Sequence, residues 1–337
     1  MNLLVISNNP DRGSFRQRIA IHLDNMRAKG IFCHVAKLPP GTLARRNLLK
    51  QSAYFDCVFI HKKRLSLFDA IRLRRYGRKI IYDFDDAVMY RDSHPERPSR
   101  KRQRSFRRTV RLADLVIAGN DYLSRHAREF TRSVNILPTG LDTGAYEVQA
   151  QPPGDGKIRL VWIGSKSTLP YLSAIRPVIE EIAVKFDKVV LRIICDDFFD
   201  LANAKVEKRP WSEQSQVQDL LTSDIGLAPL PDDRFTRGKC GFKLLQYAAA
   251  GLPAVTSPVG VNAEYVTEGV TGFHATNSSE WVSNIGRLIE SAELRRKMGR
   301  QARLWVKSFD VEVIGKRLID MIQESVKSDD CHDKDRP

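Results

Sequence analysis

Short apolar runs rich in β-branched residues alternate with amphipathic stretches along almost the whole chain, and this alternation constrains the fold most strongly. The pattern is typical of parallel βα units, in which a helix crosses back over the sheet after each strand. In the first part of the chain, we expect strands at 3–7, 32–37, 57–61, 79–83, 115–118 and 135–137. A second set of strands is expected at 159–164, 189–194, 225–229 and 254–257. Two doubly wound α/β sheets are the simplest product.

The segment Glu147–Gly156 has the composition of a linker, because it holds two prolines and two glycines and shows no apolar period. We place the domain boundary there, which gives an N-terminal domain over residues 1–150 and a C-terminal domain over 157–310. The polar residues 327–337 are expected to form a disordered tail. Arg16–Lys29 is expected to form a helix that ends before Gly30, where a C-cap glycine belongs.

Several protein classes are disfavoured by composition. No stretch approaches the roughly 18 to 20 uninterrupted apolar residues of a membrane-spanning helix, and the first residues do not resemble a signal peptide, so we expect a cytoplasmic protein. The five cysteines are scattered without CxxC spacing, which argues against a disulfide framework and a zinc site. No GxGxxG follows the first strand, which argues against a dinucleotide dehydrogenase.

The positive charge is confined to the first part of the chain. Residues 1–150 hold 29 Lys and Arg against 14 Asp and Glu, whereas the remainder holds 26 of each, so the formal net charge of +15 belongs to the first part. This asymmetry predicts an anionic partner, either a nucleic acid, an acidic membrane surface or an anionic substrate. The basic run 100–111 lacks the interleaved aromatic residues of a nucleic-acid motif, so no nucleic-acid partner is expected.

Two motifs in the second part predict an anion site. The segment Val161–Thr168 has the pattern of a strand, a small polar turn and a helix start, which directs backbone N–H groups toward a ligand. Its candidate residues are Gly164, Ser165, Lys166 and Ser167. In the segment Arg237–Gln246, Gly238 and Gly241 allow close backbone approach to a phosphate, while Lys239 and Lys243 neutralise charge.

The segments Asp224–Asp233, Arg237–Gln246, Tyr247–Pro253 and Ser257–Gly260 together resemble the GT-B glycosyltransferases, in particular retaining family 4, or glycosyl transferases group 1. The resemblance covers nearly the whole chain. It implies an α/β fold of two Rossmann-like doubly wound domains that face each other across a cleft, with a helix at 311–326 crossing back to the N-terminal domain. The implied reaction moves a sugar from a nucleotide-diphosphate sugar to an acceptor hydroxyl, with retention and without a metal or another cofactor.

The chain departs from this family at two positions. Most members hold two glutamates eight residues apart, where this sequence has Gly238 and Gln246. Gln246 can still bond ribose hydroxyls through its amide, and the sugar contact would pass to 239–242. Trp211 either stacks on the nucleotide base or caps the core. The resemblance thus implies a donor-binding set of Gly164, Ser165, Lys166, Ser167, Trp211, Gly238, Cys240, Gly241, Phe242 and Gln246.

The segment 80–87 places Asp83, Asp85 and Asp86 at the carboxyl end of a buried strand, where open α/β sheets bind ligands. Three roles compete for these carboxylates: acceptor binding, a metal-binding DxD, or capping of the following loop. We favour acceptor binding by Asp85 and Asp86. With the two lysines of the 237–246 motif, they give a predicted catalytic set of Asp85, Asp86, Lys239 and Lys243.

The resemblance also predicts the acceptor side of the N-terminal domain. The loop from Ser7 to Arg18 and the strand end near residue 120 supply the candidates Ser14, Arg16, Arg18 and Asn120. We expect a glycan or lipid-linked acceptor at the inner face of a membrane, in the synthesis of cell-surface polysaccharide or lipopolysaccharide-type glycan. The alternatives are an inactive nucleotide-binding protein of the same fold and a basic protein that binds nucleic acid or membrane surfaces.

Overall fold

The computed structural model describes residues 1–147 and 155–327. Within them, the chain forms two compact units. The first unit comprises three segments, which are Met1–Gly140, Asp233–Cys240 and the chain from Val311 onward. The second comprises Leu141–Asp232 and Gly241–Asp310. The polypeptide therefore passes between the two units four times.

This division differs from the expected domain boundaries in two respects. The first crossing lies between Gly140 and Leu141, before the expected linker, most of which (148–154) lies outside the described residues. The segment 233–240, which we assigned to the C-terminal domain, belongs to the first unit by its contacts. The last crossing, before Val311, coincides with the start of the expected returning helix. The expected disordered tail lies, apart from its first residue, outside the described residues.

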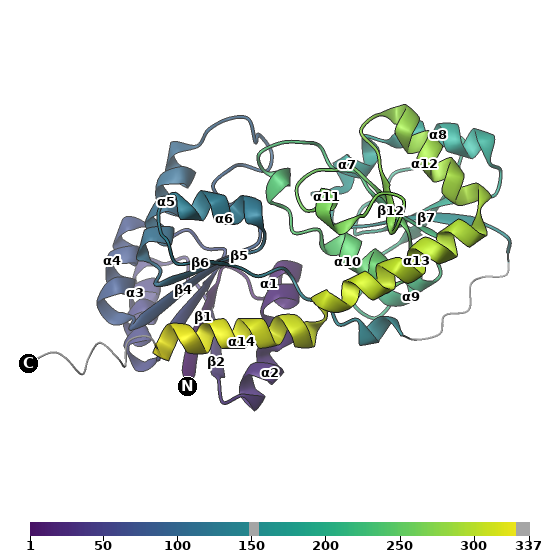
Figure 1. Ribbon diagram of the computed structural model, residues 1–337. Helices are drawn as coiled ribbons and strands as arrows, with labels where there is room; N and C mark the ends of the chain where they lie inside the picture. The colour runs from purple at the N-terminus through teal and green to yellow at the C-terminus, as the bar shows by residue number, and fades with distance from the viewer. Residues whose placement is uncertain (148–154, 328–337) are drawn as a thin grey trace, which may run out of the picture. The chain divides into compact units, whose positions relative to one another are not determined.

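The first unit is built on a sheet of six parallel strands in the order β2-β1-β3-β4-β5-β6 (Figure 1). The strands are β1 (Asn2–Ser7), β2 (Phe32–Lys37), β3 (Cys57–His61), β4 (Lys79–Phe84), β5 (Leu115–Ala118) and β6 (Val134–Ile136). The direction of winding reverses between β1 and β3, since β2 and β3 flank β1 on opposite sides. Ligands of open α/β sheets bind beyond the carboxyl ends of strands at such a reversal.

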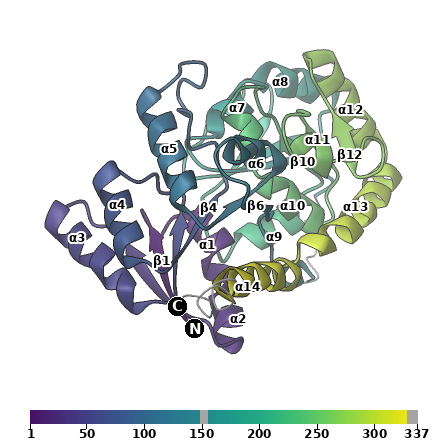
Figure 2. The ribbon, with the colours of Figure 1, turned by 60° about the vertical axis from the view of Figure 1, so that its left-hand side comes forward.

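Helices cover both faces of this sheet, because successive strand residues point to opposite sides. Leu4 and Ile6 face a core formed with α3 (Thr42–Gln51), α4 (Leu67–Tyr76), α5 (Arg100–Leu112) and α6 (Asp121–Arg128). Leu3 and Val5 face a second core formed with α1 (Gly13–Arg18), α2 (Leu23–Ala28) and α14 (Val311–Lys327). Figure 2 shows α3, α4 and α5 on one side of the sheet and α14 with α2 on the other. Short 3-10 turns complete the unit at η1 (Ala20–His22), η2 (Ser52–Tyr54) and η4 (Thr236–Gly238).

The second unit has its own six-stranded parallel sheet, in the order β12-β11-β10-β7-β8-β9. The strands are β7 (Ile158–Ile163), β8 (Val189–Ile194), β9 (Lys205–Arg209), β10 (Ile225–Ala228), β11 (Ala254–Thr256) and β12 (Gly272–His274). The winding reverses between β7 and β10, as in Rossmann sheets. The expected ligand edge of this unit is therefore the pair of strand ends at Ile163 and Ala228.

Helices also cover both faces of the second sheet. One core includes Trp162 of β7 and the buried sides of α7 (Leu169–Ser173), α8 (Arg176–Lys185) and α12 (Ser278–Glu290). The opposite core includes Ile163 and residues of α9 (Gln216–Leu221), α10 (Phe242–Ala249), α11 (Asn262–Tyr265) and α13 (Ala292–Val306). The 3-10 turns are η3 (Gly144–Tyr146) and η5 (Lys307–Phe309).

The elements of the structure differ from the expected ones at three places. The helix expected over Arg16–Lys29 is interrupted at Ile19, where φ is −124°, so that Arg18 and His22 both turn into the interior. Strand β9 was not predicted, because its sequence is polar and it forms an edge of the sheet. Strand β12 was not predicted either, since it has only three residues.

Helix α14 is the longest helix of the described chain, with 17 residues. Its Ile314, Leu318 and Ile322 are buried in the core beside α1 and α2, so its apolar side is already covered. None of the helices in the described ranges combines the length and the apolar character needed to cross a bilayer.

Candidate functional site

Four charged residues meet at the carboxyl ends of β3 and β4 in the first unit, and we call them the carboxylate cluster: Lys62, Asp85, Asp86 and Lys239. The Lys62 ammonium lies 2.9 Å from Oδ1 of Asp85 and also contacts Oδ2 of Asp86. The Lys239 ammonium lies 3.1 Å from the other oxygen of Asp86. All four side chains keep between 13% and 28% of their surface exposed, so the cluster can be reached from solvent.

The ends of two neighbouring strands position three members of the cluster. In the sheet, His61 pairs with Asp83, so the residues that follow β3 and β4 emerge side by side. Lys62 has a φ of 56° and is the only residue other than glycine with positive φ in the described chain. This left-handed backbone costs on the order of 1 kcal/mol or more for a side chain with a Cβ atom.

The segment 233–240 supplies the fourth member. Asn120, which caps α6 through its side-chain oxygen, donates from Nδ2 to the carbonyl of Lys239 at 3.1 Å. The Cys240 thiol contacts the carbonyl of Asp85 at 3.3 Å. A Cβ on Gly238 would lie 2.7 Å from that of Ala87, so only glycine allows this close packing. The segment thus docks on the loop after β4.

Two members of the cluster, Lys62 and Asp86, are held in their charged forms. Burial opposes ionisation of Lys62, but the neighbouring Asp85 and Asp86 outweigh it and raise the pKa of Lys62. Burial also favours neutral Asp86, yet the two ammonium groups outweigh it and lower the pKa of Asp86 well below its usual range. Asp86 is therefore a carboxylate at neutral pH, able to accept hydrogen bonds but already engaged by two cations.

A buried ion-paired group, formed by Arg18, His61 and Asp83, lies next to the cluster at the end of β4. Arg18 contacts Asp83 with Nε at 2.7 Å and Nη2 at 2.6 Å, and His61 Nδ1 lies 2.8 Å from the same carboxylate. Burial opposes the charge on Asp83, but Arg18 and then His61 lower its pKa. Arg18 also donates to the carbonyl of Leu137 at 2.9 Å. This group fixes the end of β4 against β3 and α1.

Two of the predicted acceptor-side residues therefore have another environment than expected. Arg18 and Asn120 are only 3% and 4% exposed, and their donors are taken up inside the first unit. Both side chains position neighbouring residues of the first unit, and their place on the acceptor side stays a prediction. Ser14 and Arg16 lie half-buried on α1, where Arg16 donates to the carbonyl of Asp11 at 3.1 Å.

In the second unit, Lys243 lies at the ligand edge of the sheet. Its ammonium donates to the carbonyl of Ile163, the last residue of β7, at 2.8 Å and lies 4.7 Å from the Trp162 ring centroid. Tyr247, one turn further along α10, fixes the helix to the sheet, because its hydroxyl donates to Leu227 at 3.0 Å and accepts from the amide of Ile163. The N-terminus of α10 and its lysine are thus held at the reversal between β7 and β10.

The predicted turn at Gly164–Ser167 follows β7 at the same edge. The hydroxyls of Ser165 and Ser167 are exposed and lie 2.9 Å apart. Lys166 is 80% exposed and lies 3.1 Å from Asp197. Helix α7 behind the turn has only five residues, so its dipole is weaker than we expected from the sequence. The eight-residue α10 has Gly241 as its N-cap residue, which has a φ of 63° and provides no side-chain cap.

A chain of polar side chains lies beside α10. Gln246 is only 4% exposed and donates to Oε1 of Gln216 at 3.1 Å and to the Tyr146 hydroxyl at 3.4 Å. Trp211 donates to the same Gln216 oxygen at 3.2 Å. Both hydrogen bonds of the Gln246 amide nitrogen are therefore made to other residues of the protein. Trp211 is half-buried against the core around α10, so both roles considered for it are compatible with its position.

The structure divides the predicted residues between the two units. Asp85, Asp86 and Lys239 come together in the first, with Gly238 and Cys240 behind them. The second unit contains the remaining donor candidates and the fourth predicted catalytic residue, at the ends of β7 and α10: Gly164, Ser165, Lys166, Ser167, Trp211, Gly241, Phe242, Lys243 and Gln246.

Sequence reasoning missed four residues that complete these groups. Lys62 follows a strand at the ligand edge, and that position was a usable signal. Gln216, Tyr146 and Thr168 carry no comparable signal, because only the fold brings them to their partners. No group of three or more metal-ligating side chains occurs in the parts of the chain that the structure describes.

A protein-family comparison covers the region around α10. Residues 209–305 match the model of the family described as glycosyl transferases group 1. This segment of the chain is therefore similar to group 1 glycosyl transferases. The match includes β10, α10, β11 and the segment that carries Lys239. No curated protein has a sequence that matches this chain significantly.

Solved structures of GT-B glycosyltransferases share the fold of nearly the whole chain. HepE of Anabaena, solved in complex with UDP and glucose, is 16% identical with a TM-score of 0.73, covering 96% of this chain and 100% of that chain. Sucrose-phosphate synthase of Thermosynechococcus elongatus is 13% identical with a TM-score of 0.75, covering 97% and 100%. The lipopolysaccharide outer core galactosyltransferase WaaB is 13% identical with a TM-score of 0.67, covering 96% and 99%. The two sheets and their helices thus form the GT-B fold.

Proposed function

We propose that this protein transfers a sugar from a nucleotide-diphosphate sugar to an acceptor hydroxyl. The observation that carries the proposal is the position of Lys243, which lies at the reversal of the second sheet within the region that matches group 1 glycosyl transferases. A cation and a helix N-terminus at this edge favour a diphosphate. The complex of HepE with UDP and glucose supports a UDP-sugar as the first donor to test.

The second unit would stabilise the leaving group. Charge grows on the nucleoside diphosphate as its bond to the sugar breaks, and preorganised donors there lower the barrier. Lys243 supplies an ammonium, α10 supplies its uncapped N-terminus, and the turn at Gly164–Ser167 supplies two exposed hydroxyls. We propose that transfer proceeds with retention and without a metal, as the resemblance to family 4 implies.

The first unit would bind the acceptor. Asp85 and Asp86 present carboxylate oxygens at the ligand edge of its sheet, where they can accept hydrogen bonds from sugar hydroxyls. Lys62 and Lys239 hold these carboxylates in place and keep the net charge of the cluster near zero. A neutral, hydroxyl-rich acceptor group fits this arrangement better than a second anion.

The acceptor is proposed to belong to a cell-surface or lipopolysaccharide-type glycan that is assembled at the inner face of a membrane. The excess of basic residues over 1–147 supports this proposal, and so do the exposed apolar side chains of α4, namely Leu67, Phe68 and Ile71. Each basic side chain near an acidic bilayer contributes about 1 kcal/mol to binding. The galactosyltransferase WaaB, which shares the fold, supports the same acceptor class.

One observation favours an inactive nucleotide-binding protein as the second candidate. Gly238 and Gln246 occupy the two positions where the resembling family holds glutamates, and Gln246 is buried in contacts with Gln216 and Tyr146. Such a protein would bind a nucleoside diphosphate without turnover, so binding and turnover must be measured separately.

The test measures the thermal stability of the purified protein with UDP, GDP, ADP, CMP and their sugars, with and without magnesium, because a ligand of the native state raises the melting temperature. Lys243→Met should abolish the shift, and Lys188→Met, at an exposed lysine of the same unit, should retain it. Release of free nucleoside diphosphate from the sugar then reports turnover. A shift without turnover would favour the inactive protein, and no shift with any nucleotide would contradict donor binding.

A further inference from the structure

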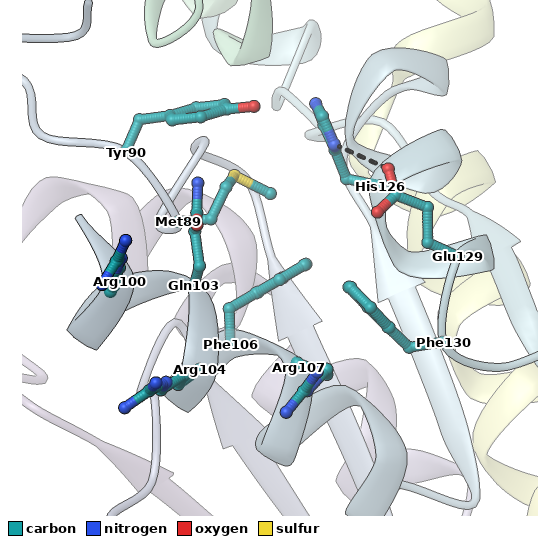
Figure 3. A pocket seen from close by; sticks show the side chains of 10 residues that line it. All are labelled: Met89, Tyr90, Arg100, Gln103, Arg104, Phe106, Arg107, His126, Glu129 and Phe130. Atoms are coloured by element: carbon teal, nitrogen blue, oxygen red, sulfur yellow. Dashed lines mark ion pairs between the residues drawn. The ribbon is translucent and has the colours of Figure 1, made fainter. Parts of the chain in front are cut away.

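A cavity of about 500 Å³ lies in the first unit between α5, α6 and the loop after β4. Its floor is apolar and consists of Met89, Phe106 and Phe130, while Arg100, Arg104 and Arg107 of α5 line one side (Figure 3). The volume lies within the roughly 300 to 1,000 Å³ of small-molecule sites. None of these residues belongs to the carboxylate cluster or to the ligand edge of the second sheet.

The arginine wall is built by helical spacing and fixed by its neighbours. Arg100, Arg104 and Arg107 are spaced by four and three residues, which places them on one side of α5. Between them, Arg102 turns inward and donates to the carbonyl of Tyr90 at 2.7 Å, tying the loop after β4 to the helix. Ser99 caps the start of α5. The wall is therefore anchored to the loop that closes the cavity.

The three guanidinium groups have no acceptor among the residues that the structure describes. The only carboxylate that lines the cavity is Glu129, which lies 3.4 Å from His126. Figure 3 shows this pair on the side of the cavity away from the arginines. Three like charges along one helix repel one another, and an anion between them would remove that repulsion while forming charge-assisted hydrogen bonds.

The chemistry of the lining specifies the anion further. Guanidinium groups bind phosphate through paired hydrogen bonds, and they are preferred where the phosphate lies beside an apolar surface. The rings of Phe106 and Phe130 meet edge to face in the floor, with their centroids 6.3 Å apart. The cavity thus offers cationic groups for one part of a ligand and aromatic rings for another part.

We propose that this cavity binds a phosphate ester, with its phosphate on Arg100, Arg104 and Arg107 and the esterified group against Phe106 and Phe130. The site is separate from the proposed sugar transfer and does not depend on it. A soluble phosphorylated compound and a phospholipid headgroup share this chemistry. The two sources differ in whether the esterified group is free in solution or anchored in a bilayer.

The experiment measures binding by calorimetry with three probes: inorganic phosphate, phenyl phosphate, and vesicles of phosphatidylglycerol mixed with phosphatidylcholine. The variant is Arg104→Gln/Arg107→Gln in the full chain. Its matched control, Arg27→Gln/Arg46→Gln, removes the same charge from exposed positions on α2 and α3. UDP binding is measured in parallel, and it should be unchanged in both variants, so failure of this site is distinguishable from failure of the proposed donor site.

We expect phenyl phosphate to bind at least about 5-fold more tightly than inorganic phosphate, because the ring adds apolar contact. The pocket variant should weaken binding about 10-fold or more, and the control by less than 2-fold. Binding of phenyl phosphate without binding of vesicles would assign a soluble ester. Binding of both phenyl phosphate and vesicles would assign a phospholipid headgroup. Equal losses in both variants, or no binding of any probe by the unmodified protein, would overturn the proposal.

Discussion

Lys62 combines an unfavourable backbone with favourable charge contacts, and two substitutions separate these contributions. Lys62→Ala and Lys62→Gly both remove the ammonium that contacts Asp85 and Asp86, but only glycine adopts a φ of 56° without strain. We expect Lys62→Gly to have a free energy of unfolding about 1 kcal/mol higher than Lys62→Ala, measured by urea denaturation. At a position with negative φ, the alanine variant of a protein is usually more stable than the glycine variant. An alanine variant equal to or above the glycine variant would show that the backbone at Lys62 carries no strain.

Asp86 should make stability depend on pH. Lys62 and Lys239 lower its pKa in the folded state, so its contribution is fully present above the unfolded value near 4 and is lost as the pH falls below it. At pH 7, we expect Asp86→Asn to lower the free energy of unfolding by about 1 to 3 kcal/mol. The difference from the unmodified protein should shrink below about pH 4 in urea denaturation series.

The control for Asp86 is Asp187→Asn, at an exposed carboxylate without an ion pair in the described chain. It should change stability by less than about 0.5 kcal/mol at any of these pH values. A loss for Asp86→Asn that stays constant from pH 7 to below pH 4 would contradict the assigned ion pairs.

At the scale of elements, the segment 233–240 depends on a close approach of two backbones. A Cβ on Gly238 would meet Cβ and N of Ala87 and a methyl group of Leu123 at 2.7 to 2.9 Å. Gly238→Ala should therefore lower the free energy of unfolding by about 1 to 3 kcal/mol and loosen the segment. Faster tryptic cleavage after the exposed Arg234 or Arg237 would report the loosening.

Gly41→Ala is the matched control, because a Cβ at Gly41 meets no atom within 4 Å and its φ of −77° suits any residue. It should leave both stability and cleavage within error of the unmodified protein. If Gly238→Ala is cleaved at the same rate as Gly41→Ala, the segment does not depend on this contact.

The sequence predicted most strands correctly because their apolar, β-branched runs end at polar turn residues. The same rule fails for the edge strand β9, whose Lys205–Arg209 is polar, because an edge strand is stabilised by pairing with β8 and buries little apolar surface. The break at Ile19 depends on Asp83, 65 residues away from Arg18, and no local pattern contains such a contact. The local sequence was enough to select Asp85, Asp86 and Lys243 as candidate site residues. The contacts of Lys62 and the docking of 233–240 could be recognised only from the three-dimensional structure.

At the scale of the whole molecule, the four passes of the chain between the units link their folding. The segment 233–240 of the first unit is bounded on both sides by chain of the second, and the second ends where α14 of the first begins. Partial unfolding of the first unit therefore acts on segments that continue directly into the second. All four tryptophans belong to the second unit, at positions 162, 211, 281 and 305, so their fluorescence reports on that unit separately.

This connectivity predicts that a core defect in the first unit also destabilises the second. Ile117 of β5 has no exposed surface, and Ile117→Ala should lower the free energy of unfolding by about 2 to 5 kcal/mol. We expect the urea midpoint from tryptophan fluorescence to fall together with that from far-UV circular dichroism, because cooperative unfolding gives coincident transitions. Leu43→Ala, at a side chain that is 77% exposed in the same unit, should shift neither midpoint. An unchanged fluorescence midpoint beside an early dichroism phase would mean that the units unfold independently despite their shared chain.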